Sequence, residues 1–284
     1  MISIIICSRS QTISSDLFEN IKNTIGCNYE LIVIDNSENK YSIFEAYNLG
    51  IKKSFGDFLC FIHDDIFIHT NSWGTIINRI FKEDQQIGLI GVAGAKIKTK
   101  MPSPWWNCPE DQKVICIIQH YTNNQKEKMV SGFDNCSNIT EVVIIDGVFM
   151  ALRKDDNIIF DATMRGFHNY DLNISFEYKK QGYKVVVTNQ IFIEHYSVGN
   201  INEQWVKSAY KIHKKYKNSL PLKNESSVIK KGTEIANAIN FIEESVKFKK
   251  FNIAYLIWWD LFCLYPNIKY HVKFWRNVLN RKRC

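Results

Sequence analysis

The stretch that decides the fold is "DFLCFIHDDIFIH", residues Asp57–His69. Its first half contains an unbroken apolar run, Phe58–Ile62, which predicts a buried β-strand. His63, Asp64 and Asp65 follow this run directly. Two adjacent carboxylates at the tip of a buried strand are costly unless positive charge lies between them. The stretch therefore predicts a strand that ends at a binding site for a positive group.

Similar apolar runs lie on both sides of this strand and alternate with segments of helical spacing. We expect strands at 2–7, 30–35, 57–62 and 87–93, and helices at 14–26, 41–55 and 73–81. This order predicts a parallel sheet with helices on both faces. Ligands of such sheets bind beyond the C-terminal ends of the strands, so the polar residues at those ends are the candidates.

The rest of the chain changes character twice. Residues 96–139 are rich in Pro, Trp, Asn and Lys, and we expect loops with short strands there. Regular patterns return as a strand at 141–153, interrupted at Asp146-Gly147, a helix at 171–181, and strands at 183–188 and 191–195. After Gly199 only helical patterns remain, at 202–217, 225–249 and in two short segments. We therefore expect two units, residues 1–200 and 201–284.

The composition narrows the class of protein. The 284 residues are 45% hydrophobic and 23% charged, which suits one large globular domain or a domain with an appendage. The net charge of +7 favours anionic partners such as nucleotides, and is too small to indicate nucleic acid. No two of the eight cysteines form a C-x-x-C pair, and we expect a reducing, cytosolic compartment. "MISIIICSRS" at the start reads as a strand and not as a signal peptide.

Three segments in order carry a family resemblance: "VIDNS" (33–37), "AYNLGIKKSFGDFLCFIHDDI" (46–66) and "GFHNYDLNISFEYKKQGYKVVV" (166–187). Together they resemble a family-2-type glycosyltransferase of the GT-A fold, in the glycosyltransferase-like subgroup that has H-D-D in place of D-x-D. The resemblance covers about residues 1–200. It implies an α/β fold with a Rossmann-like mixed sheet, here followed by a helical C-terminal extension. It also implies a metal-dependent transfer of a sugar from a nucleotide-sugar, with a UDP-sugar favoured, to a hydroxyl of a glycan or glycoconjugate. The transfer would invert the anomeric carbon and would serve polysaccharide biosynthesis.

The resemblance assigns residues to the nucleotide-sugar donor. Asp35 matches the aspartate that accepts a hydrogen bond from the nucleobase imide, although "DNS" also suits an Asx-turn. Ser8 and Arg9 follow the first strand, where such enzymes cradle the base, and Arg9 could instead be a solvated surface residue. Asn48 lies in the segment resembling A-R-N-x-G-I, where Tyr47 replaces the usual arginine. Asn48 could equally cap or pack its helix.

The H-D-D triplet is the expected metal site. Asp65 matches the direct ligand of Mn²⁺ or Mg²⁺, and His195 in "IFIEHYSVG" matches the histidine that completes the site in many GT-A enzymes. His63 takes the position that faces the ribose or a metal-bound water, and Asp64 is expected to face the sugar hydroxyls. A surface turn with two solvated acids and a structural role for His195 are the alternatives. An HD-type phosphohydrolase is disfavoured, because its His-Asp pair lies on a helix.

The chemistry is expected at "GFHNYDL". Asp171 matches the general base that takes the proton of the acceptor hydroxyl, while a role as helix N-cap is the alternative. Asp146 is expected near the donor sugar or the acceptor. Trp105 and Trp106 are expected to stack on the acceptor sugar, unless they are core residues, and His168 is a lesser acceptor candidate.

Three questions stay open from the sequence. A sugar-nucleotide pyrophosphorylase would need a Gly-rich phosphate loop after the first strand, and "CSRSQTISS" contains no glycine. A catalytically inactive nucleotide- or sugar-binding module remains a second alternative. The tail "WWDLFCLYPNIKYHVKFWRNVLNRKRC" (258–284) is aromatic and then basic, so it could lie on the inner face of an anionic membrane or form a helical cap.

Overall fold

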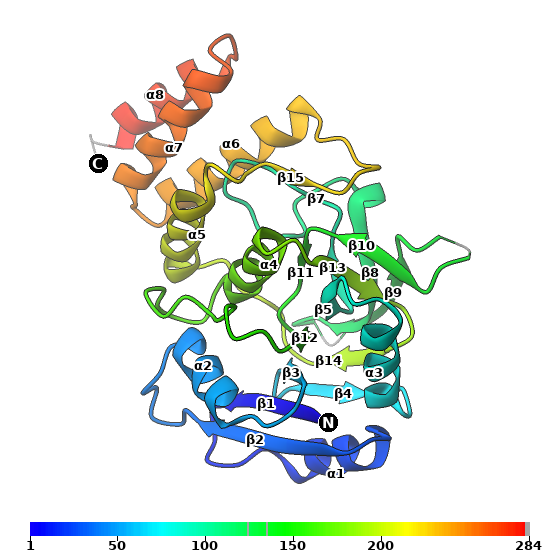
Figure 1. Cartoon of the computed structure of the whole chain (residues 1–284). Coiled ribbons are helices and arrows are strands. Elements are labelled where there is room, and N and C mark those ends of the chain that lie inside the picture. The colour runs from blue at the N-terminus through cyan, green and yellow to red at the C-terminus, as the bar shows by residue number, and fades with distance from the viewer. Residues whose placement is uncertain (124, 135, 282–284) are drawn as a thin grey trace.

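A large mixed β-sheet forms the centre of the molecule (Figure 1). The computed structural model describes residues 1–123, 125–134 and 136–281, with side chains up to residue 276. The strands of the central sheet, in spatial order, are β10 (Ile139–Val142), β13 (Lys184–Thr188), β5 (Ile87–Gly91), β12 (Phe149–Arg153), β3 (Phe58–Ile62), β1 (Ile2–Ser8) and β2 (Tyr29–Asp35). The mixed α/β architecture expected from the resemblance is confirmed.

The four strands expected to form a parallel sheet, β1, β2, β3 and β5, share one direction, and antiparallel strands complete the mixed sheet. β1 runs parallel to β2 and β3, and β13 runs parallel to β5. However, β12 lies between β3 and β5 and is antiparallel to both. A buried apolar run such as "FMALR" carries no information about strand direction, so its place in the middle of the sheet could not be read from the pattern.

A second sheet lies beside the C-terminal ends of β1 and β3, and it supplies half of the candidate site. Its strands are β11 (Ile144–Ile145), β6 (Ala93–Ala95), β8 (Lys113–His120), β14 (Ile193–His195) and β4 (Ile66–Ile68), with β9 (Lys126–Ser131) paired to β8. The β8–β9 hairpin corrects the expectation of loops with short strands over 96–139, where a short 3₁₀ helix (Glu110–Gln112) also occurs. The interrupted strand expected at 141–153 is three strands in two sheets, β10, β11 and β12.

Local signals explain the helices that flank the central sheet, which are α1 (Ser15–Thr24), α2 (Ile43–Lys53), α3 (Trp73–Glu83) and α4 (Tyr170–Lys180). Ser14 caps α1 by accepting a hydrogen bond from the Leu17 amide, as expected for this residue. Ser42 and Glu45 form a capping box at the start of α2. Gly50 lets α2 approach β1 so closely that a Cβ there would collide with the Ile5 side chain.

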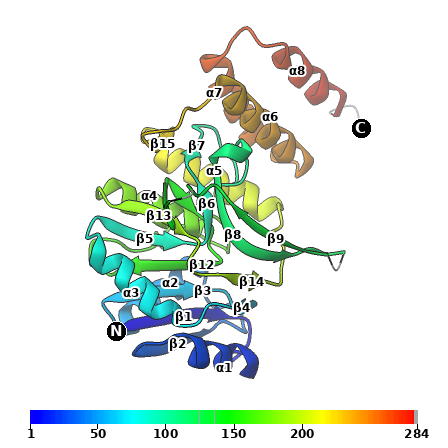
Figure 2. The same ribbon diagram turned by 90° about the vertical axis from the view of Figure 1, so that its right-hand side faces the viewer.

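The C-terminal helices pack around a hydrophobic cluster of their own. They are α5 (Glu203–Tyr216), α6 (Lys231–Lys247), α7 (Phe251–Leu264) and α8 (Tyr270–Arg281). α6 begins later than expected, after a short pairing of β15 (Leu222–Lys223) with β7 (Ile97–Lys98). Figures 1 and 2 place α7 and α8 at the end of the molecule opposite β1 and β2. α5 contributes Trp205 to this cluster and Tyr216 to the main core.

Candidate functional site

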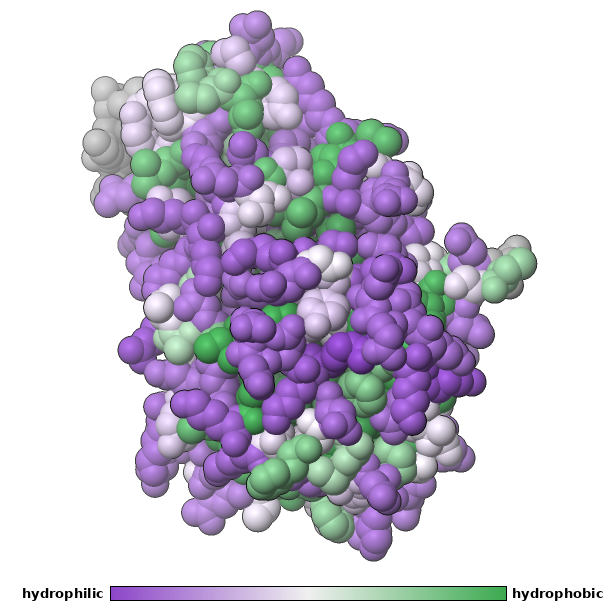
Figure 3. All heavy atoms as spheres, in the orientation of Figure 1, coloured by the Kyte–Doolittle hydropathy of each residue, from purple (hydrophilic) through white to green (hydrophobic). Residues whose placement is uncertain are grey.

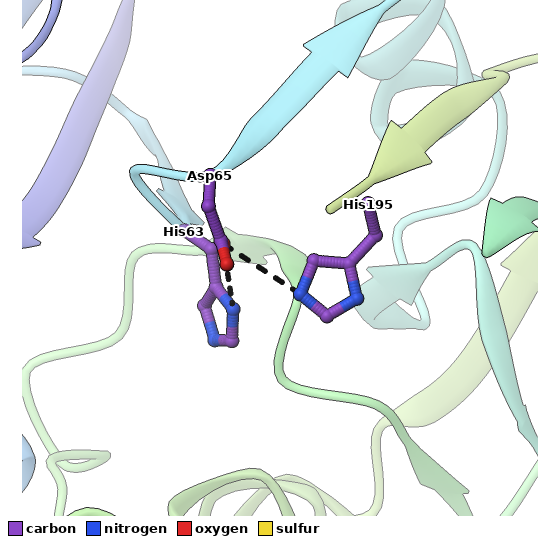
Figure 4. Close-up of side chains that lie close together, drawn as sticks. All are labelled: His63, Asp65 and His195. Atoms are coloured by element: carbon purple, nitrogen blue, oxygen red, sulfur yellow. Dashed lines mark ion pairs between the residues drawn. The ribbon is translucent and has the colours of Figure 1, made fainter. Parts of the chain in front are cut away.

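Three metal-ligating side chains converge where the two sheets meet. Asp65 precedes β4 and His195 ends β14, and these strands pair antiparallel with His195 opposite Ile66. Asp65 Oδ1 lies 3.6 Å from His63 Nδ1 and 3.6 Å from His195 Nε2. One ligand atom from each of the three residues lies within 4.8 Å of the others, and the side chains point toward one another (Figure 4). The structure thus brings together Asp65 and His195, as expected, and adds His63 to them.

The environment of His195 prepares its Nε2 atom for a cation. Gln119 on β8 is the register neighbour of His195, and its Oε1 atom lies 3.1 Å from His195 Nδ1. The Gln119 amide nitrogen donates to the carbonyls of His120 and Ser197, which fixes Oε1 as the acceptor. His195 Nδ1–H therefore donates to Gln119, which leaves Nε2, on the side of Asp65, as the nitrogen available to a cation. Such an outer hydrogen bond is typical of metal-ligating histidines.

Asp65 stays ionised in this setting. Burial raises the pKa of the carboxyl group, but hydrogen bonds with His195, His63 and Ser197 outweigh it and hold the pKa well below its usual range. His63 is held in turn by Tyr170, whose hydroxyl lies 2.6 Å from His63 Nε2. In the protein without a cation, the imidazole N–H groups that face Asp65 donate these hydrogen bonds. A bound cation would take the place of those protons, with His63 Nε2–H donating to the tyrosine oxygen and Nδ1 available for coordination. A carboxylate with two imidazole lone pairs is a donor set that fits a divalent transition metal such as Mn²⁺.

A first cavity of about 410 Å³ lies on one side of this group, at the C-terminal ends of β1 and β3. The cavity is lined by four of the expected donor residues, Ser8, Arg9, His63 and Asp64. Asp64 is held by the Ser8 hydroxyl at 3.2 Å and by the Arg9 amide at 3.4 Å. Its carboxylate thus ties the H-D-D turn to the end of β1. The prediction that Asp64 faces sugar hydroxyls stays untested.

Two expected donor residues have other partners. Asp35 accepts hydrogen bonds from the Ser37 amide and hydroxyl at 2.9 and 2.7 Å, which lower its pKa and form the Asx-turn named as the alternative. Asp35 is exposed at the end of β2, and its second oxygen makes no protein hydrogen bond within the described residues. Asn48 exchanges two hydrogen bonds with the Phe160 backbone, at 2.7 and 3.0 Å, and does not line the cavity. Both nucleotide contacts remain predictions, and the role that the structure gives Asn48 is packing.

A second cavity of about 520 Å³ lies on the other side of the same group. It shares three wall residues with the first cavity, His63, Phe167 and Tyr170. All the residues expected at the acceptor or in catalysis line it; they are Trp105, Trp106, Asp146, His168 and Asp171. The candidate metal site therefore lies where a donor cavity and an acceptor cavity would meet.

Asp171 has the electrostatics of a base. It is the second residue of α4, after Asn169 as N-cap, so the alternative that Asp171 is the cap is wrong. Its carboxylate accepts a hydrogen bond from the Leu172 amide at 2.9 Å. Burial raises the pKa of Asp171 to about 7, and the negative charge of Asp146 adds to the rise. A carboxyl group with a pKa near neutrality is suited to proton transfer at physiological pH.

The Asp146 carboxylate is held in place by two hydrogen bonds. One of its oxygens accepts from Trp105 Nε1 at 2.6 Å and the other from the Val148 amide at 2.8 Å. Trp105 is thereby turned with its ring in the wall of the second cavity, and Trp106 lies edge-on to it with a ring separation of 5.8 Å. Burial lowers the pKa of His168, which disfavours a charged imidazole there.

Sequence reasoning missed three residues of the site, Gln119, Phe167 and Tyr170. The Tyr170 hydroxyl holds His63, a contact that no motif in the sequence indicated. Gln119 lies in the segment that was expected to be mostly loop. Its signal would have been the apolar run "VICII" (114–118) followed by the polar residues Gln119 and His120.

Comparisons with known proteins agree with this geometry. A model of the glycosyltransferase-like family matches residues 3–231, and the chain therefore belongs to this family. This family is described as glycosyltransferase-like, in agreement with the resemblance of the three sequence segments. No curated protein matches the chain.

Solved structures support the fold. The crystal structure of GalNAc-T7 with UDP, GalNAc and Mn²⁺ aligns with a TM-score of 0.52 at 12% identity, over 93% of this chain. The chain spans 58% of the GalNAc-T7 chain. A crystal structure of A197 from STIV aligns over 81% of this chain and 96% of that chain at 10% identity, but its TM-score of 0.38 is too low to carry an argument. At these identities the first likeness shows the GT-A fold alone.

Proposed function

We propose that the chain transfers a sugar from a nucleotide-sugar donor to a hydroxyl group of a glycan or glycoconjugate acceptor, with inversion at the anomeric carbon. The observation that carries this proposal is the position of the His63–Asp65–His195 group between two cavities of ligand size. A donor in the first cavity would place its diphosphate at this group. Its sugar would then reach the second cavity, where Asp171 lies.

The three ligands favour Mn²⁺ over Mg²⁺. Mg²⁺ prefers oxygen ligands, whereas Mn²⁺ also accepts imidazole. A bound cation would supply positive charge against the leaving diphosphate. The likeness to a structure that contains UDP and Mn²⁺ supports the same choice and supports a UDP-sugar as donor. Arg9, on the wall of the first cavity, and Asp35, through its second carboxylate oxygen, are the proposed contacts to the base and its phosphates.

Asp171 takes the proton of the acceptor hydroxyl as that oxygen attacks the sugar. Asp146 keeps the pKa of Asp171 high through its fixed negative charge, and it orients the Trp105 ring. Trp106 is exposed and offers a ring face to the acceptor sugar, whereas Trp105 is buried in the main core and forms the cavity wall beside it. His168 borders the same space. In the second cavity Asp171 thus moves the proton, and the other residues position the acceptor.

In this proposal residues 1–200 carry the metal, donor and catalytic residues, and residues 201–284 form the helical extension. The enzyme works in the cytoplasm, where contact with the inner face of a membrane would run through the C-terminal helices. No helix within the described residues is long and apolar enough to cross a bilayer.

A thermal-shift panel of UDP, TDP, GDP and ADP tests the donor, each with Mn²⁺, with Mg²⁺ and with EDTA. Stabilisation follows affinity by mass action, so UDP with Mn²⁺ should give the largest rise in Tm. The matched enzymatic assay measures UDP release from UDP-sugars. If no nucleoside diphosphate raises Tm when Mn²⁺ is present, the proposed donor site is wrong.

A further inference from the structure

Helix α7 exposes a row of apolar side chains that the fold leaves uncovered. Its inner face, with Ile257, Trp258 and Leu261, is buried against the C-terminal cluster. Its outer face repeats every fourth residue and consists of Phe251, Tyr255, Trp259 and Cys263, with Leu256 and Leu264 beside them. Trp259, for example, keeps 49% of its surface exposed. A helix that is apolar on all sides is normally buried on all sides, so we expect another molecule to cover this outer face.

Helix α8 continues the same surface. The Trp275 ring packs edge-on to Tyr255 at 6.3 Å and to Trp258 at 5.2 Å, and Trp275 and Val272 are themselves exposed. The two helices therefore present one contiguous aromatic surface, which we call the α7–α8 surface. Figure 3 shows hydrophobic residues gathered at the upper end of the molecule, over these helices and among hydrophilic ones.

The net charge of the chain is concentrated in its C-terminal segment. Residues 248–284 contain eight Lys or Arg and one acidic residue, which accounts for the whole net charge of +7. The acidic residue, Asp260, is neutralised by Lys217 at 2.6 Å. Lys250 and Lys273 pair with glutamates of neighbouring helices, whereas Lys249, Lys269 and Arg276 have no ion pair within the described residues. The side chains of 277–284, with the last basic residues, lie outside the described part.

We propose that the α7–α8 surface docks on an anionic lipid bilayer, with the aromatic rings in the interface and the free basic residues on lipid headgroups. Tryptophan and tyrosine favour this boundary because one end of the ring is apolar and the other polar. A helix of 14 residues is about 21 Å long, which is too short to span the hydrocarbon but suits a position along the interface. The inference rests on the peripheral location proposed above and not on the transfer reaction.

The positive charge of the α7–α8 surface argues against a second copy of the chain as its partner. A symmetric dimer through this surface would bring two equally basic patches together, which like-charge repulsion disfavours. An anionic bilayer satisfies both properties at once, since it offers an apolar layer beneath a negative one.

Flotation of the full chain with vesicles tests the proposal. Vesicles of phosphatidylcholine are compared with vesicles containing about 30% phosphatidylserine, at low and physiological salt. We expect binding to the anionic vesicles that weakens as salt rises. The double variant Leu256→Ser, Trp259→Ser should bind about tenfold more weakly or worse, because it removes apolar area from the interface. Phe55→Ser is the matched control, since Phe55 is 83% exposed and lies before β3, far from this surface.

A charge variant separates the two contributions. Lys269→Glu with Arg276→Glu should weaken binding to anionic vesicles by at least about tenfold, because each basic residue near the surface contributes about fivefold. Every variant must keep the wild-type Tm and its response to UDP and Mn²⁺, which separates a failure of docking from a failure of the donor site. The proposal is overturned if wild type binds neutral and anionic vesicles equally, or if the apolar variant binds like wild type. A dimer in light scattering that the apolar variant disperses would also overturn it.

Discussion

Replacing Asp171 by asparagine should stabilise the folded protein while abolishing its activity. The folded state raises the pKa of Asp171 from 3.8 to about 7, through burial and the charge of Asp146. Between these pH values the folded state holds a proton that the unfolded state has lost, so the free energy of unfolding falls as pH rises through this window. Each pH unit corresponds to about 1.4 kcal/mol, which gives about 4 kcal/mol at pH 8.

The Asp171→Asn variant escapes this cost because the amide is never charged, and its oxygen can still accept from the Leu172 amide. Its stability advantage should grow from near zero at pH 4 to about 4 kcal/mol at pH 8, a rise in Tm of about 5–10 °C. Thermal unfolding in EDTA across this pH range measures the difference without a bound cation. Turnover should fall about 10²–10⁴-fold, while UDP affinity stays close to wild type.

Asp161→Asn is the control of opposite sign. The pKa of Asp161 is lowered, because hydrogen bonds from Lys215 and Thr163 outweigh its burial, so its substitution should destabilise the protein at pH 8. A stability difference for Asp171→Asn that is constant with pH would refute the raised pKa. Turnover within a few-fold of wild type would reject Asp171 as the base and direct attention to His168 or Asp146.

Three further substitutions test the cation site and the packing around the donor cavity. Asp65→Asn should abolish Mn²⁺-dependent UDP binding in calorimetry, and an affinity equal to wild type would remove Asp65 from the metal site. Gln119→Leu should weaken Mn²⁺ binding by about 10–100-fold, measured by electron paramagnetic resonance, because His195 loses its orienting partner; unchanged Mn²⁺ affinity would limit Gln119 to a structural role. Asn48→Ala should lower the free energy of unfolding by about 1–3 kcal/mol, because two buried hydrogen bonds to Phe160 are lost, and should leave UDP affinity unchanged. A selective loss of UDP affinity would instead support the nucleotide contact expected from the sequence.

The fold could be predicted wherever its signals are local. The strands β1, β2, β3 and β13 are short apolar runs bounded by polar residues, and helices α1 and α2 begin at serine caps. Each of these patterns depends only on residues that are close to it in the sequence. The order and direction of strands depend on which runs pair across the molecule, so the place of β12 between β3 and β5 could not be predicted.

The same division explains the candidate site. Asp65 and His195 could be named because each directly adjoins an apolar strand, at positions matched by the resemblance. Gln119 could not be named, because its role depends on the parallel pairing of β8 with β14. Tyr170 reaches His63 across 107 residues of sequence, and no periodicity in either segment records that contact.

The loop that carries Trp105 and Trp106 shows how the extension takes part in the site. This loop has no regular structure of its own between β7 and the 3₁₀ helix, yet helix α6 holds it in place. Glu234 on α6 accepts hydrogen bonds from the amides of Lys100 and Met101 at 3.0 and 2.6 Å, and Asn237 donates to the Asn107 carbonyl at 3.0 Å.

The boundary expected at residue 200 therefore does not delimit the second cavity. One wall of this cavity belongs to residues 104–106, and their position depends on side chains beyond residue 230. The family match also continues to residue 231, past the expected boundary. If α6 were removed together with the last helices, the tryptophans would lose the contacts that fix their loop, even though every residue of the His63–Asp65–His195 group would remain. The helical extension thus helps to hold the wall of the second cavity, where we propose that the acceptor binds, and its outer helices α7 and α8 carry the exposed apolar surface.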